Sequence, residues 1–219
     1  MGVRNRLAAA MVAALMVLAM SSASASASAA CPGDEVPPTE ATAYDSVMTV
    51  VCDINEFRAR NGLRPLSWDW RLWYGAQNHA ADMAARHYLA HVSPEGHGLA
   101  DRISPTGYIP PAAGWTVSEN LGFGTMMLSS PLAITVGWLN SEVHRENMLD
   151  PEVDNVGVGL GFGPVADGGQ PGIIYVADFG HRDEPVAAPK PPVAARTTRP
   201  RTVTRKFRVR VRPGRTGRR

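Results

Sequence analysis

Helix-forming and strand-forming patterns are separated along this 219-residue chain, and their order constrains the fold more than any other feature. The helical patterns come first. Apolar residues at three- and four-residue steps predict a helix over residues 44–60, which Gly62 would terminate. A second helix is expected over residues 67–87 with Ser67 as its cap, and a third amphipathic segment covers residues 131–139.

Strand patterns concentrate late in the chain. Residues 153–162 and 172–179 are rich in Val, Ile and Tyr, and a turn-forming Asp-Gly-Gly lies between them at 167–169. This arrangement predicts an antiparallel hairpin with a long loop. A weaker strand pattern covers residues 115–118. Helices followed by antiparallel strands predict an α+β domain, because parallel sheets usually need alternating strands and helices.

The first 30 residues have the pattern of a secretory signal peptide. Arg4 and Arg6 precede an apolar run of 14 residues from Leu7 to Met20, and a small-residue stretch follows. The run is shorter than the roughly 18 to 20 residues that a spanning helix needs, so we expect no transmembrane segment in the mature chain. We expect a secreted protein that can also associate with the cell envelope. The residues before Cys31 lack the large aliphatic side chain of a lipidation signal, which argues against a lipid anchor there.

The remainder of the chain consists of an acidic region followed by a basic one. Residues 31–186 contain 20 acidic residues and 8 arginines, a formal net charge of −12, whereas residues 187–219 contain 12 basic residues and no acidic one. We expect an N-terminal arm over residues 31–42 and one folded domain over residues 43–182. The Pro- and Arg-rich tail over residues 183–219 cannot bury enough apolar surface to fold alone, so it is expected to be disordered.

The charge of the tail predicts an anionic partner. One interpretation is an electrostatic tether to an anionic cell-envelope polymer or to lipid head groups, and the other is a solvated tail or one that folds back on its own acidic domain. Nucleic acid is disfavoured as a partner, because Phe207 is the single aromatic residue in the tail. The expected contacts are the basic side chains of Arg205, Lys206, Arg208, Arg210 and Arg212.

Cys31 and Cys52 are the two cysteines of the chain. An exported protein meets an oxidising compartment, so we expect a disulfide between them. The closed loop of about 20 residues corresponds to about 3 kcal/mol of stabilisation in chain-entropy arguments. The bond would fix the N-terminal arm to the first helix.

Two histidines and a glutamate, far apart in the sequence, are the candidates for chemistry: His91, Glu119 and His144. Two neutral imidazoles and a carboxylate suit zinc or a similar divalent ion with an open coordination position, and they also suit an acid/base site. Without a metal, the same side chains would form a hydrogen-bonded polar cluster. Ser141 lies three residues before His144, but no nucleophile elbow is present, and the His-Glu-x-x-His spacing is absent, so the catalytic residues stay unassigned.

Six short motifs surround or accompany these residues. They are NxxR at 55–58, GLxPL at 62–66, HVSP at 91–94, SENL at 118–121, WxxSxxHR at 138–145 and ADFG at 177–180. In this respect the chain resembles the bacterial branch of the CAP superfamily, the sperm-coating or cysteine-rich secretory protein family, over roughly residues 43–181. The resemblance implies an α-β-α sandwich with a central antiparallel sheet, in which His91, Glu119 and His144 line a cleft that can hold a divalent metal.

The resemblance does not identify the fourth residue that would bind the metal. Animal and plant members carry a later histidine in a segment that here reads IIYVAD at 173–178 and contains none. Asp178 and Glu142 are the remaining candidates. Family members are also linked to lipid binding, and an apolar segment after the Glu-Asn dipeptide could line such a groove. Its residues are Phe123, Met126, Met127 and Leu128.

Two functions are compatible with these features. The first is a secreted binding module without enzyme activity, whose cleft or apolar groove takes a metal, a lipid or a small ligand while the basic tail holds it at the envelope. The alternative is a metal-dependent hydrolase of the peptidase kind that uses the same cleft. We favour the binding module, because the sequence shows no independent general base in a recognised spacing.

Overall fold

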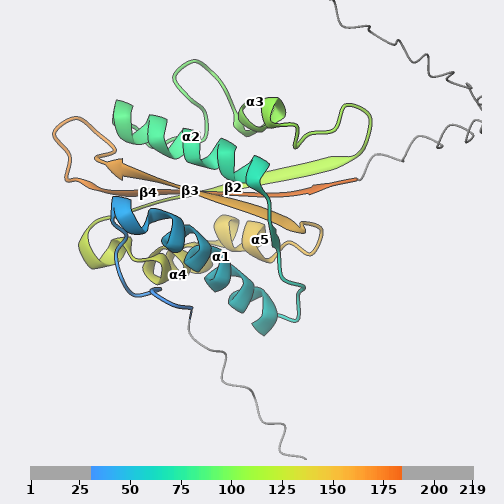
Figure 1. The fold of residues 1–219 in the computed structure, drawn as a ribbon, viewed down its shortest axis with the longest axis horizontal. Helices are drawn as coiled ribbons and strands as arrows, with labels where there is room; N and C mark the ends of the chain where they lie inside the picture. The colour runs from blue at the N-terminus through green and yellow to red at the C-terminus, as the bar shows by residue number, and fades with distance from the viewer. Residues whose placement is uncertain (1–30, 184–219) are drawn as a thin grey trace, which may run out of the picture.

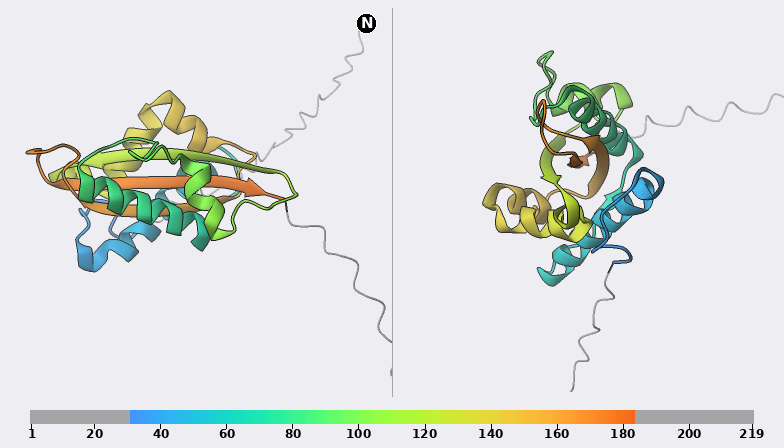
Figure 2. Two further views of the ribbon diagram at one scale, coloured as in Figure 1. Left: turned by 90° about the horizontal axis from the view of Figure 1, so that it is seen from above. Right: turned by 90° about the vertical axis from the view of Figure 1, so that its left-hand side faces the viewer.

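The computed structural model describes residues 31–183, in which a sheet lies between two layers of helices (Figure 1). The sheet contains, in spatial order, β1 (Ser67–Trp68), β3 (Asn155–Gly163), β4 (Gly172–Arg182) and β2 (Trp115–Gly124). One face is covered by α2 (Trp70–Arg86) and α3 (Leu99–Ile103), and the other by α1 (Ala43–Arg60), α4 (Pro131–Asn140) and α5 (Glu142–Leu149). Short 3-10 turns are η1 (Glu40–Thr42), η2 (Ser104–Thr106) and η3 (Met126–Ser129). The expected α+β sandwich is confirmed, and the end-on view in Figure 2 separates its layers.

Strand β4 is the centre of the antiparallel part of the sheet. It pairs with β3 as the expected hairpin, and on its other side with β2. The weak strand pattern at 115–118 marks only the start of β2, which continues to Gly124. The three long strands form the expected antiparallel sheet, and β1 pairs in parallel with β3, so the sheet as a whole is mixed. With two residues, β1 is too short to show any periodicity.

The three expected helices are present, with one shifted start. Helix α1 ends before Gly62, whose φ of +71° allows the chain to leave the helix. Helix α2 begins at Trp70 rather than near Ser67, because Ser67 lies in β1 and the side chain of Asp69 accepts the cap hydrogen bond from the Arg71 amide at 2.8 Å. Helices α3 and α5 were not predicted, since each has at most eight residues.

Glycines in β3 bring α2 unusually close to the sheet. A Cβ built on Gly157 would lie 2.0 Å from the Trp73 nitrogen, and one built on Gly159 would lie 2.3 Å from the Gln77 nitrogen. No side chain larger than hydrogen fits between the two backbones. The glycine-rich stretch 157–163 therefore allows α2 to pack closely on β3.

The opposite face of the sheet carries the larger apolar core. Side chains of β3 and β4 pack there against α1, α4 and α5, and the cluster includes Val50, Ile54, Trp138, Val158 and Phe179. Full burial of such side chains stabilises the fold by about 1.5 to 3 kcal/mol each. This core holds α4 and α5 against the same sheet that α2 covers from the other side.

Helix side chains bond to main-chain groups at both edges of the sheet, which are β2 on one side and, beyond the two residues paired with β1, β3 on the other. Gln77 of α2 bonds both main-chain groups of Leu160 in β3, at 2.8 and 3.1 Å. On the β2 edge, the Trp138 indole donates to the Leu121 oxygen at 2.8 Å and Asn147 donates to the Glu119 oxygen at 3.3 Å. These contacts block part of each edge from pairing with another strand.

Asn55 and Arg58 of α1 fix the loop that follows the helix. Asn55 bonds both main-chain groups of Leu66, at 3.0 and 2.7 Å. The guanidinium of Arg58 is 1% exposed and donates to the Arg64, Met148 and Asp150 oxygens, each at 2.9 Å. Burial lowers the pKa of Arg58. One buried side chain thus ties the end of α1 to the end of α5.

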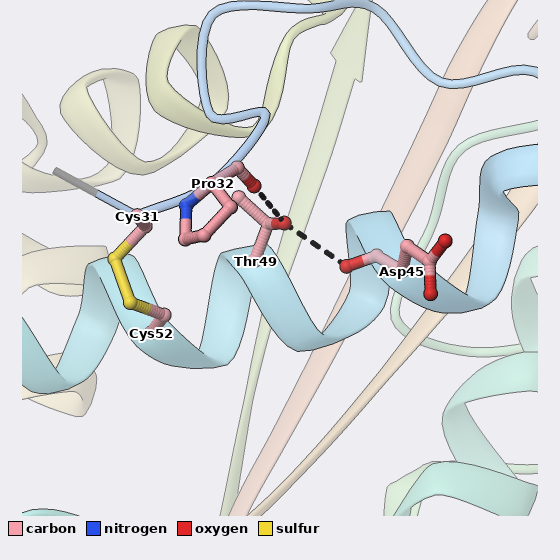
Figure 3. The surroundings of a disulfide bond; sticks show 5 residues. All are labelled: Cys31, Pro32, Asp45, Thr49 and Cys52. Atoms are coloured by element: carbon pink, nitrogen blue, oxygen red, sulfur yellow. Dashed lines mark hydrogen bonds between the residues drawn. A yellow bond between two sulfur atoms is a disulfide. The ribbon is translucent and has the colours of Figure 1, made fainter.

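The expected disulfide between Cys31 and Cys52 is confirmed (Figure 3). It joins the arm to α1 with a Cα–Cα distance of 5.9 Å. The Thr49 hydroxyl donates to the Pro32 oxygen at 2.8 Å and strengthens the same junction.

Two expectations fall on segments that lie outside the described residues: the signal peptide at 1–30 and most of the basic tail, including Arg205–Arg212. Among the helices of residues 31–183, none is long and apolar enough to cross a bilayer.

Candidate functional site at the edge of the sheet

Glu119 is the centre of the candidate site. It lies in the edge strand β2, and its side chain is 3% exposed. His91, from the segment between α2 and α3, places Nδ1 at 2.7 Å from Glu119 Oε1. Arg102 of α3 binds the other carboxylate oxygen, Oε2. Both oxygens of the carboxylate are therefore engaged.

Arg102 also holds the loop that carries His91. Its Nη1 donates to the main-chain oxygens of His91 at 2.8 Å and of His97 at 3.2 Å. A single guanidinium therefore positions both the carboxylate and the loop. The hydrogen bond to Glu119 raises the pKa of His91, since the carboxylate accepts from the protonated ring and stabilises it.

Asp178 lies directly opposite Glu119, on β4. Its carboxyl group is fully buried, and within residues 31–183 neither of its oxygens has a hydrogen-bond partner. Burial, together with the charge of Glu119, raises the pKa of Asp178 well above its usual value. The raised pKa favours the protonated form of Asp178, which reduces the repulsion between two neighbouring carboxylates.

His144 occupies the other side of the site. It lies on α5, and its Nδ1 is 2.8 Å from the Ser141 hydroxyl. Burial and the nearby positive charge of His91 lower the pKa of His144. His144 is therefore close enough to His91 to respond to its charge.

Asn120 connects the two faces. Its side chain points away from that of Glu119, because successive residues of a strand alternate. Asn120 Nδ2 donates to the His144 oxygen at 2.9 Å, and Asn147 donates to Asn120 Oδ1 at 2.8 Å. The Glu-Asn dipeptide thus fixes the His91 loop on one face and the His144 helix on the other.

The two candidates for a fourth ligand do not join the group. Asp178 is sealed beneath Glu119, and Glu142 is exposed on α5. Within residues 31–183, no three His, Cys, Asp or Glu side chains are gathered closely enough to hold a metal ion. The groups at the site that can bind a ligand are the imidazoles of His91 and His144, whose Nδ1 atoms contact Glu119 and Ser141 respectively.

The residues of the expected apolar groove do not share one environment. Phe123 of β2 packs into the core beneath α2, where its ring lies close to Gly172. Met126, Met127 and Leu128 of η3 instead protrude, with exposed fractions of 85, 64 and 71%. They form an exposed apolar patch at the end of β2, which we call the η3 patch.

The sequence reasoning missed three residues of the site: Arg102, Asn147 and the positioning role of Asn120. Arg102 lies on a five-residue helix, and its partner is 17 residues away, so no local spacing marks it. Asn147 lies three residues after His144 on the same helix, and that spacing was the available signal. His79 of α2 is a core residue, 2% exposed, with Nε2 at 2.9 Å from the Ala90 oxygen.

Comparison with known proteins places this α-β-α sandwich in a defined class. The chain belongs to the CAP family, the cysteine-rich secretory protein family, whose profile matches residues 52–179. The matched stretch includes the whole candidate site.

Two curated relatives from Bacillus subtilis are similar in sequence. The uncharacterized protein YkwD is 33% identical over 122 residues, which are 56% of this chain and 44% of that protein. The uncharacterized membrane protein YlbC is 33% identical over 106 residues, which are 48% of this chain and 29% of that protein. This chain therefore spans less than half the length of either relative.

Solved structures show similar folds. An outer surface protein from Borrelia burgdorferi has a TM-score of 0.51 at 22% identity, with 64% of this chain and 94% of that chain covered. An extracellular protein containing an SCP domain from Bacillus anthracis is 28% identical, with a TM-score of 0.46 and 65% and 44% of the two chains covered. The first of these comparisons agrees with the assignment of the fold.

Proposed function

We propose that the chain is an extracellular binding module whose ligand site lies at the β2 edge, around His91, Glu119 and His144. The observation that carries the proposal is that His91 and Arg102 engage both oxygens of Glu119. A carboxylate held in this way orients its imidazole partner and is not free to act as a general base. The arrangement therefore favours binding over hydrolysis.

The two imidazoles are the groups that would hold a divalent metal such as zinc. Glu119 and Ser141 engage the Nδ1 atoms, which leaves Nε2 of His91 and of His144 as the available ligand atoms. Neutral imidazoles suit zinc, and a carboxylate behind a ligating histidine is its common outer partner. A bound metal would supply Lewis-acid character for an anionic or carbonyl ligand. With only two protein ligands, water or the ligand itself would complete the coordination shell.

Zinc calorimetry tests this site on the chain from Cys31 to Arg219. We expect saturable binding that His91→Ala and His144→Ala each weaken strongly. The control is His87→Asn, because His87 pairs with Asp167 away from the site and asparagine tolerates its φ of +57°. Equal binding by all four proteins would refute the site. Zinc-dependent cleavage of a peptide substrate that both histidine variants abolish would favour the hydrolase instead.

The η3 patch is the feature that fits a lipid ligand. Three consecutive exposed apolar side chains exceed the scattered exposure that is normal for a soluble domain. We expect the chain to sediment with phosphatidylcholine vesicles, and replacement of Met126, Met127 and Leu128 by serine to abolish this. Replacement of the exposed Val143 on α5 is the control. Unchanged sedimentation of the triple variant would exclude the patch.

The basic tail is proposed to hold the module at an anionic surface. Twelve basic residues within 187–219 carry no compensating acid, so their attraction to polyanions is long-ranged and sensitive to salt. Deletion of residues 187–219 should release the protein from anionic cell-envelope polymer while zinc binding stays unchanged. Retention of the shortened protein would refute the tether.

A further inference from the structure

A cleft of about 480 Å³ lies between the exposed face of α2 and the segment that follows His91. Its wall includes Tyr74, Asn78 and Asp82 from α2, and Glu95, Asp101 and Arg102 from the opposite side. The volume lies within the range of small-ligand sites. None of His91, Glu119 and His144 lines this cleft, so it is a different cavity from the site proposed above, although Arg102 borders both.

One wall of the cleft provides aromatic surface. Tyr74 is 51% exposed, and Trp70, one helical turn before it, is 55% exposed. Residues four apart lie on the same face of a helix, so Trp70 adds exposed aromatic surface next to Tyr74, outside the lining of the cleft. The neighbouring Trp68 and Trp73 instead pack against the main core. The core therefore accepts aromatic side chains from this region, and a lack of space in it does not explain why Trp70 and Tyr74 are exposed.

The same cleft has hydrogen-bonding groups without partners. The side-chain amide of Asn78, one turn beyond Tyr74, makes no hydrogen bond with another residue of 31–183, and neither does the Tyr74 hydroxyl. The guanidinium of Arg102, in contrast, is already engaged, because Nη1 bonds to the His91 and His97 oxygens, Nη2 bonds to Glu119, and Nε is buried. The amide of Asn78 and the hydroxyl of Tyr74 are therefore the groups in this wall that are available to a polar ligand.

The charges around the cleft are largely paired with one another. Arg86 binds Glu95 at 2.7 Å and Asp82 at 3.4 Å. Tyr88 donates to Asp82 at 2.5 Å, and Asp101 accepts from the Gly98 amide at 2.9 Å. Because these charges already have partners, the cleft offers hydrogen bonds and ring faces more than net charge. A neutral ligand suits it better than an ion.

We propose that this cleft binds a neutral oligosaccharide, with a pyranose ring lying on Tyr74 and its hydroxyl groups bonded to Asn78. Sugars combine an apolar C–H face with hydroxyl groups around the rim, which matches an exposed ring beside an amide that has no partner among the described residues. The proposal goes beyond the metal and lipid sites, because Tyr74 and Asn78 belong to neither of them.

The test is a titration of the chain from Cys31 to Arg219 with chitotetraose and with cellotetraose, followed by calorimetry and tryptophan fluorescence. We expect binding of at least one sugar with a change in tryptophan emission. Tyr74→Ala should weaken it by about tenfold or more, because the stacking ring is lost. Tyr74→Phe should retain most of the affinity, and Asn78→Ala should lose part of it. His91→Ala should bind the sugar normally, which separates this site from the metal site.

Tyr44→Ala is the matched control, because Tyr44 is 61% exposed on α1, on the opposite side of the sheet. Its sugar affinity should equal that of the unaltered chain. Absence of binding for both sugars, or binding that Tyr74→Ala leaves unchanged, would overturn the proposal. A synthetic peptide of residues 199–212 is tested in parallel. If the peptide binds in a Tyr74-dependent manner and the sugars do not, the cleft belongs to the chain's own basic segment and the proposal is wrong.

Discussion

Asn120 donates a hydrogen bond from Nδ2 to the main-chain oxygen of His144 at 2.9 Å, and it thereby anchors α5 to the edge strand. Its neighbour Glu119 holds His91 on the opposite face of the sheet. Two consecutive residues of β2 thus set the positions of two histidines that lie more than 50 residues apart in the sequence. The candidate site depends on this dipeptide as much as on the histidines.

Replacement of Asn120 by alanine should damage both stability and the site. Asn120 is fully buried and bonds both His144 and Asn147, so the variant leaves buried partners unsatisfied. We expect a loss of about 1 to 3 kcal/mol in the free energy of unfolding, measured in urea, and weaker zinc binding. The control is Asn61→Ala, since Asn61 is exposed and bonds only within its own helix end. Equal effects of the two substitutions would contradict the positioning role.

A side chain added between α2 and β3 should strongly destabilise the fold. A Cβ on Gly159 meets the α2 backbone at 2.3 Å, so Gly159→Ala must push the helix away from the sheet. We expect a loss of about 3 kcal/mol or more by urea unfolding. Gly137 in α4 has no atom within 4 Å of its Cβ position, so Gly137→Ala should instead gain about 0.5 to 1 kcal/mol. Changes of opposite sign in the free energy of unfolding of the two variants would support the close packing of α2 on β3.

Asp53 should make the stability of the fold depend on pH. Burial, and next the nearby charge of Asp34, raise the pKa of Asp53 from 3.8 to about 7. Between these values the folded state keeps a proton that the unfolded state has lost, so the free energy of unfolding falls as pH rises from about 4 to about 7.

Asp53→Asn should remove this pH dependence. At a pH of about 8, we expect it to raise the free energy of unfolding by on the order of 2 to 4 kcal/mol. Asp45→Asn, at an exposed position of the same helix, should leave the dependence intact. An unchanged slope in the Asp53 variant would show that this carboxyl group titrates normally in the folded state.

Glu119→Gln separates an orienting carboxylate from a metal ligand. If Glu119 acts through His91, zinc affinity should fall by about 10- to 100-fold but persist. If Glu119 is itself a ligand, the loss should match that of His91→Ala. The variant also leaves Arg102 without its ionic partner, so circular dichroism must first show that it is folded at the temperature of the titration.

Much of the fold could be predicted, because its determinants are local. Regular spacing of apolar residues marks α1 and α4, and the Val- and Ile-rich stretches mark the hairpin of β3 and β4. Strand β1 could not be predicted, since Ser67 and Trp68 become a strand only through pairing with Asn155 and Val156. The start of α2 was displaced for the same reason.

The site could be predicted only in part. The family motifs identify His91, Glu119 and His144, but they do not show how these residues contact one another. Arg102 enters the site because α3 packs against β2, which is a tertiary effect. The sealed position of Asp178 also follows from strand register, and it makes this residue a neighbour of Glu119 and not an available ligand.

The most direct test of the proposed site is an NMR measurement of the imidazole nitrogens during zinc titration of the uniformly 15N-labelled chain from Cys31 to Arg219. The account predicts that zinc shifts the Nε2 resonances of His91 and His144 together, while their Nδ1 atoms keep the signature of protonated, hydrogen-bonded nitrogens. Shifts at Nδ1, or a response confined to other histidines, would contradict it.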